Sequence, residues 1–122
     1  MYTALVLDQA SHNKLVEKLK TQIPTGWKIY CHHMTINMGN ATKGPEADNL
    51  NKSAKVTVVA FGFGQKVVAV KVTSDVKSNN ETKHITVAVD VNNGGKPFMS
   101  NQIIDWTNID CFELVGTIQE VN

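Results

Sequence analysis

Residues 55–73 read KVTVVAFGFGQKVVAVKVT, with β-branched and aromatic side chains on both sides of two closely spaced glycines. Such side chains favour strands, and the glycines favour a tight turn. We therefore expect two strands, Lys55–Phe63 and Gln65–Thr73, joined as a hairpin around Gly62 and Gly64. This hairpin predicts an antiparallel sheet.

The rest of the chain shares the β bias, since Val, Ile and Thr make up 34 of the 122 residues. Further strands are expected at Tyr2–Leu7, Trp27–Cys31, His33–Met38, His84–Val91 and Cys111–Val121. Polar or glycine-rich loops are expected at 39–52, 74–83 and 92–97. The predicted fold is α+β, mostly antiparallel strands with one main helix.

The main helix is predicted over residues 9–20, beginning at Ala10 or Ser11. Leu15, Val16 and Leu19 would share its apolar stripe. A second, short helix is expected to run to Trp106, with Ser100 or Asn101 as its cap.

Length and charge limit the function classes. A chain of 122 residues is expected to form a single domain, 1–122, and its short apolar runs predict a cytoplasmic protein with no membrane segment. The net charge is +1, which excludes a polycationic nucleic-acid surface. All twelve cationic side chains are lysines, so any phosphate must be held by Lys, His, hydroxyl or backbone N–H groups.

The two cysteines, Cys31 and Cys111, are expected to be reduced and buried, because a domain of this length needs no disulfide. Cys31 and His33 would share a strand face, which raises the question of a zinc site. No further cysteine or histidine cluster completes four ligands, so no metal and no cofactor are expected.

Two short segments repeat one pattern, His33-Met34-Thr35-Ile36 and His84-Ile85-Thr86-Val87, 51 positions apart. Side chains alternate across a strand, so each tetrad places an imidazole and a hydroxyl on one face and two apolar side chains on the other. Either tetrad alone is also explained by a histidine at the edge of the core that is satisfied by hydrogen bonds. The repeat of the pattern favours one cleft that both tetrads share. Two imidazoles can act as acid and base, and two hydroxyls can bind phosphoryl oxygens.

These paired His-x-Thr-apolar tetrads resemble the 2H phosphoesterase superfamily. The resemblance implies two pseudo-symmetric lobes around a groove, one tetrad from each, and action on 2′,3′-cyclic phosphates or 2′–5′ linkages in RNA. The small 2′,3′-cyclic phosphodiesterase modules of RNA end repair, associated with RNA and tRNA ligases, are the most similar. On this chain the implied roles fall on His33 and His84 as catalytic residues and on Thr35 and Thr86 as phosphate ligands.

Several further residues are candidates for the same site. Lys96, in Gly94-Gly95-Lys96-Pro97, could neutralise a phosphate that the glycine amides approach; a surface turn explains this segment equally well. Tyr30 and Phe98 flank the tetrads and could stack on a base, as could Trp27 and Trp106. His32 is expected to point away from His33.

The predicted function is metal-independent hydrolysis of a 2′,3′-cyclic phosphate at an RNA or nucleotide end, with an RNA ligase as a possible partner. The sequence does not assign which histidine is the base. One alternative is hydrolysis of cyclic oligonucleotide signals, as in some phage anti-defence 2H enzymes. Another is a non-catalytic module that binds the phosphate of an RNA end, and a third is a structural protein without a site.

Overall fold

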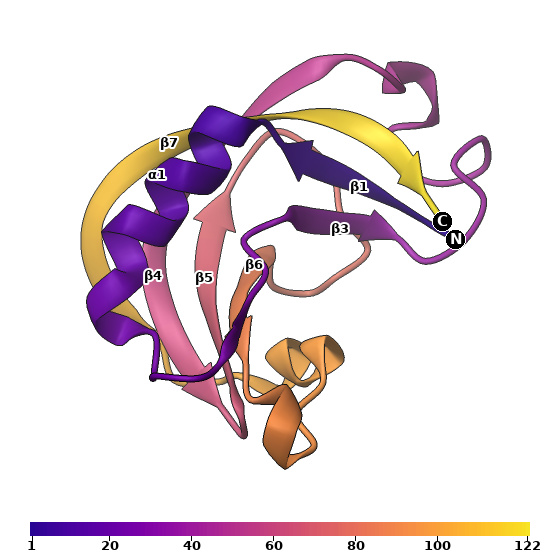
Figure 1. Ribbon diagram of the computed structural model, residues 1–122. Helices are drawn as coiled ribbons and strands as arrows, with labels where there is room; N and C mark the ends of the chain where they lie inside the picture. Colours follow the sequence, from indigo (N-terminus) through magenta and orange to yellow (C-terminus); the bar gives the residue numbers. More distant parts are fainter.

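The computed structural model describes residues 1–122, and all its strands belong to one antiparallel sheet. The elements in chain order are β1 (Tyr2–Leu7), α1 (Gln9–Leu19), η1 (Lys20–Gln22), β2 (Lys28–Ile29), β3 (His33–Asn37), η2 (Ala47–Asn49), β4 (Ser53–Gly64), β5 (Val67–Thr73), β6 (His84–Val89), η3 (Val91–Asn93), η4 (Pro97–Gln102) and β7 (Thr107–Val121). The sheet order is β2-β6-β3-β1-β7-β4-β5. An additional β5–β6 pairing closes six of these strands into a barrel (Figure 1).

Closure of the barrel follows from the alternation of apolar and polar residues along its strands. Every second residue of β3 is buried, and β4 shows the same alternation between Val56 and Gly62. The inward side chains form one apolar core. The expected α+β class and the hairpin are confirmed, but the position of the turn is wrong. The two turn residues are Gln65 and Lys66, whereas Gly62 and Gly64 lie within β4 and pair with β5. Lys66 takes the positive φ, +62°, that was expected of a glycine.

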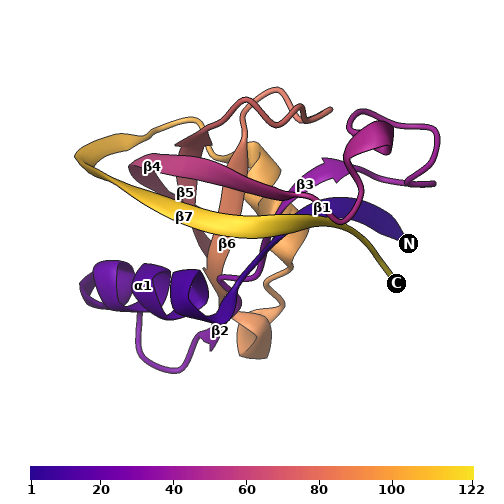
Figure 2. The same cartoon turned by 90° about the horizontal axis from the view of Figure 1, so that it is seen from above.

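Helix α1 packs against β7 and β6 and lies beside the barrel (Figure 2). Leu15 and Leu19 enter the core, as the apolar stripe predicts. The helix begins earlier than expected, because the Asp8 side chain is its N-cap and accepts a hydrogen bond from the Ser11 amide at 2.7 Å. No helix is long and apolar enough to cross a membrane.

The prediction of a short helix that runs to Trp106, with Ser100 or Asn101 as its cap, is wrong. The 3₁₀ element η4 begins at Pro97, whose fixed φ suits a first helical position, and ends at Gln102. Ser100 therefore lies inside it, and its hydroxyl donates to the Pro97 carbonyl at 2.8 Å. This segment covers the outer face of β5 and β6, where Ile103 packs with Val67, Ala69 and Val89 in a second apolar cluster.

The prediction that Cys111 is buried is also wrong. Cys31 is buried, whereas Cys111 is exposed, and both thiols are free. The pairing of β4 with β7 shifts register between Val58 and Ala60, so residues 109–111 form a bulge opposite Val59. A bulge interrupts the alternation of side chains between the two faces of the sheet, and Cys111 lies in it with its side chain exposed.

The two separate lobes implied by the resemblance are not confirmed. The strands that carry the tetrads, β3 and β6, are neighbours in the same closed sheet. The paired histidines therefore meet across one strand pairing.

Gly116 on β7 is required by the close approach of β1. A Cβ added there would lie 2.5 Å from the Val6 carbonyl oxygen, which is backbone and cannot turn away. We expect Gly116→Ala to lower the free energy of unfolding by about 2 kcal/mol, as overpacking does. Urea denaturation checks this, with Gln119→Ala at an exposed position of β7 as the control. A Gly116→Ala protein as stable as the Gln119→Ala protein would contradict the expectation.

Candidate active site

The two tetrads lie side by side because Met34 of β3 is paired with Ile85 of β6. In an antiparallel pair, the residues on either side of this pair also oppose each other, which puts Thr35 opposite His84 and His33 opposite Thr86. Met34 and Ile85 are fully buried in the core. The two imidazoles and two hydroxyls therefore share the outer face of the barrel, as the alternation predicts.

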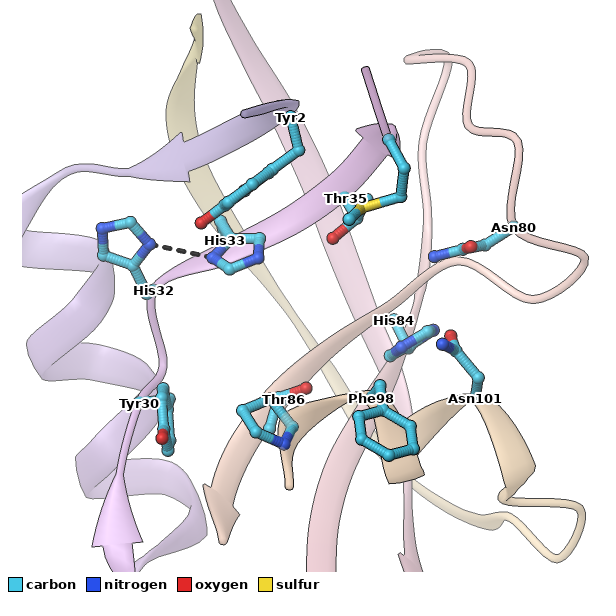
Figure 3. A pocket seen from close by; sticks show the side chains of 12 residues that line it. Tyr2, Tyr30, His32, His33, Thr35, Asn80, His84, Thr86, Phe98 and Asn101 are labelled. Carbon is cyan, nitrogen blue, oxygen red and sulfur yellow. Dashed lines mark hydrogen bonds between the residues drawn. The ribbon is translucent and has the colours of Figure 1, made fainter. Parts of the chain in front are cut away.

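A cavity of about 680 Å³ covers this face, and all four tetrad side chains line it (Figure 3). Of the four candidates for base stacking, Tyr30 and Phe98 also line it, whereas Trp27 and Trp106 do not. The other lining residues are Tyr2, His32, Met38, Asn80, Pro97 and Asn101. The structure thus brings together six of the nine candidate site residues named from the sequence.

Lys96, the candidate for neutralising a phosphate, is exposed and lies outside the lining of the cavity. The amides of Gly94 and Gly95 donate to the carbonyls of Val91 and Asp90, at 3.2 and 2.9 Å. These bonds are those of a surface turn, which was the alternative explanation of this segment. No lysine lines the cavity.

His33 is neutral at neutral pH. Burial is the main cause that lowers its pKa to about 4, and the positive charges of His32 and His84 lower it further. Tyr2 lies beside it, with ring centroids 5.0 Å apart. An uncharged imidazole can accept a proton, which is what a general base requires.

His84 is 9 % exposed and is held by the Thr82 carbonyl, 2.8 Å from its Nδ1. A carbonyl only accepts hydrogen bonds, so Nδ1 carries the proton. Nε2 is then the nitrogen that can exchange a proton with a ligand.

His32 was expected to point away from His33, and this is wrong. It lines the same cavity, and its Nδ1 is 2.9 Å from Nδ1 of His33 (Figure 3). Strand alternation fails here because Cys31 has a φ of +46°, a left-handed conformation that interrupts the strand. The Nδ1–H of His12 on α1 donates to the Cys31 carbonyl at 2.9 Å and supports this kink.

Thr86 is connected to a buried serine that sequence reasoning took for a helix cap. Ser100 is 2 % exposed; its Oγ is 2.7 Å from Thr86 Oγ1 and donates to the Pro97 carbonyl. Because the Ser100 hydroxyl proton is directed at the Pro97 carbonyl, the Ser100 oxygen accepts a hydrogen bond from the Thr86 hydroxyl. If Ser100 instead turned its proton to Thr86, the Thr86 hydroxyl could donate to a phosphoryl oxygen.

The loop between β5 and β6 closes one side of the cavity. Ser78 Oγ donates to the Thr35 carbonyl at 2.7 Å, and the Asn79 amide donates to the Ile36 carbonyl at 2.8 Å. These bonds to β3 bring Asn80 to the cavity. Nothing in the sequence of this polar loop signals that contact.

No group of three or more His, Cys, Asp or Glu side chains is arranged to hold a metal ion. The site offers imidazole, hydroxyl and amide groups, with aromatic rings at its edge. These groups can transfer protons and donate hydrogen bonds to an anion.

The family model of the fungal tRNA ligase phosphodiesterase domain matches residues 10–120. The chain belongs to this family. The domain is a 2H phosphoesterase-type module, so the resemblance drawn from the tetrads is confirmed. Membership in the tRNA ligase phosphodiesterase family supports a phosphodiesterase function in RNA repair. No curated protein and no solved structure matches the chain.

Proposed function

We propose that the chain hydrolyses a 2′,3′-cyclic phosphate at an RNA or nucleotide end without a metal ion. The observation that carries this proposal is the meeting of both tetrads in one cavity, in a chain of the tRNA ligase phosphodiesterase family. A terminal cyclic phosphate suits such a cavity, because its anionic phosphorus centre needs hydrogen-bond donors and two proton transfers. Tyr30 and Phe98 give the terminal base a surface for stacking.

In the proposed mechanism, His33 is the general base and His84 the general acid. Neutral His33 takes a proton from water, and the water oxygen bonds to phosphorus while one ribose oxygen leaves. The imidazolium of His84 gives a proton to that oxygen, so the product is a phosphomonoester beside a free hydroxyl. Thr35 and Thr86 donate hydrogen bonds to the non-bridging oxygens, where negative charge grows.

An RNA oligonucleotide that ends in a 2′,3′-cyclic phosphate tests this function when EDTA is present. We expect conversion to a monophosphate end, and the product isomer identifies the bond that is cleaved. Binding of the oligonucleotide without conversion would overturn the proposal and favour a phosphate-binding module. Conversion that stops in EDTA would overturn metal independence.

Ser100→Ala tests the hydroxyl pair at Thr86. Without Ser100, the Thr86 hydroxyl loses the hydrogen-bond partner that fixes its orientation in the cavity. We expect kcat for the cyclic phosphate to fall about tenfold, in keeping with the loss of one oriented hydrogen bond. Steady-state kinetics measure this, with Ser74→Ala, whose hydroxyl bonds the Lys55 carbonyl outside the site, as the control. Equal kcat values for the two variants would contradict this role of Ser100.

A further inference from the structure

A second cleft of about 520 Å³ lies next to the active-site cavity. The two share Asn80, His84 and Asn101 in their linings, so they adjoin each other at these side chains. The cavity covers β3 and β6, whereas the second cleft extends across β6 to β5 and η4. Its other lining residues are Lys71, Asn79, Glu81, Thr82, Ser100, Ile103, Ile104 and Trp106.

Lys71 lines the second cleft from β5, beside β6, the strand that carries His84. It is paired with His84 across β5 and β6, and paired residues point to the same face of a sheet. Val70 and Val72, its neighbours on β5, point into the core, so Lys71 points outward. It is the one lysine in the lining of either cleft.

The ammonium group of Lys71 has no acidic partner. The one ion pair of the chain joins Lys20 to Glu17 on α1. Glu81 also lines the second cleft but is exposed on the β5–β6 loop, whereas Lys71 is half-buried on the strand. An unpaired lysine held next to His84 is suited to an anion that lies one position away from the reacting phosphate.

An apolar wall completes the second cleft. Ile104 is 85 % exposed, and Trp106 is half-buried and packed over Gly62, where an added Cβ would meet its ring at 2.9 Å. Gly62 therefore leaves the space that seats the indole. A flat base can pack on such a surface without sequence preference.

We propose that the second cleft binds the nucleotide that precedes the cyclic-phosphate end, with its phosphodiester at Lys71 and its base against Ile104 and Trp106. This inference rests on the proposed function, since it takes the terminal nucleotide to occupy the first cavity. It assigns the substrate class as an RNA end of at least two nucleotides. The volume lies within the range of about 300–1,000 Å³ that is usual for ligand sites.

The test compares a nucleoside 2′,3′-cyclic phosphate with a dinucleotide that ends in the same group. We expect kcat/KM to be about tenfold higher for the dinucleotide, because only it places a phosphodiester at Lys71. Lys71→Gln and Ile104→Ser should each lower this ratio toward one. Lys55→Gln, at an exposed position of β4 outside both clefts, should leave the ratio unchanged.

Equal kcat/KM for the two substrates, or a ratio unaffected by Lys71→Gln, would overturn the inference and leave the proposed function in place. Calorimetric binding of the dinucleotide 3′-phosphate separates the two claims. Binding that Lys71→Gln weakens, with neither cyclic substrate hydrolysed, would support the second cleft and overturn the proposed function. Equal binding by the native and Lys71→Gln proteins would overturn the second cleft alone.

Discussion

His33→Ala and His84→Ala should each lower kcat for a 2′,3′-cyclic phosphate by about 10³-fold, the middle of the range for general acid–base catalysis. Each substitution removes one of the two imidazoles that exchange protons in the proposed mechanism. The double variant should be little slower than either single variant, since proton removal and proton donation act in one step. Steady-state rates with saturating substrate measure all three proteins.

His32→Ala is the matched control for these two variants. His32 lines the same cavity but is exposed, and its imidazole is hydrogen-bonded to that of His33. We expect its kcat to fall by no more than about tenfold, the cost of one positioning hydrogen bond. A His32→Ala protein as slow as His33→Ala, or a His84→Ala protein as fast as the native chain, would contradict the assigned roles.

The second large effect is on stability at acidic pH. The pKa of His33 falls from 6.5 in the unfolded chain to about 4 in the folded protein. Between these values the unfolded state binds more protons, so stability decreases as the pH falls from about 6.5 to 4. The expected loss is about 3 kcal/mol between pH 7 and pH 4, from 1.36 kcal/mol per pKa unit.

Chemical denaturation at pH 7 and pH 4 measures this loss, and His33→Gln separates it from the other titrating groups. Glutamine keeps much of the side-chain volume but does not titrate. The loss of stability between the two pH values should therefore be about 3 kcal/mol smaller in His33→Gln than in the native chain. An equal loss in both proteins would show that His33 is not held neutral by its surroundings.

The elements with strong local patterns could be predicted from the sequence. The two hairpin strands and the helix stripe of Leu15 and Leu19 required only periodicity, and the structure confirms them. The turn of the hairpin lies at Gln65 and Lys66 and not at the glycines. Alternation alone also places His33 with Thr35 on one face of β3. These features depend on side chains a few positions apart, which a sequence displays directly.

Features that depend on long-range contacts or unusual backbone could not be predicted. Cys31 adopts a left-handed φ that sequence propensities assign to Gly or Asn, so the position of His32 was missed. Ser100 reaches Thr86 only through the return of η4 over β6, and Lys71 reaches the face of His84 only through the closure of β5 on β6. That closure also makes the sheet a barrel, and the expected pair of lobes around a groove is not confirmed.

Phosphorus NMR of an RNA end that carries a 2′,3′-cyclic phosphate tests the central claim most directly. The native chain, His33→Ala and His84→Ala are each incubated with it in EDTA, and the cyclic phosphate signal is followed over time. The account predicts that the native chain replaces this signal with that of one phosphomonoester, while both variants leave it unchanged over the same period. A cyclic phosphate signal that persists with the native chain, or disappears equally fast with both variants, would contradict the account.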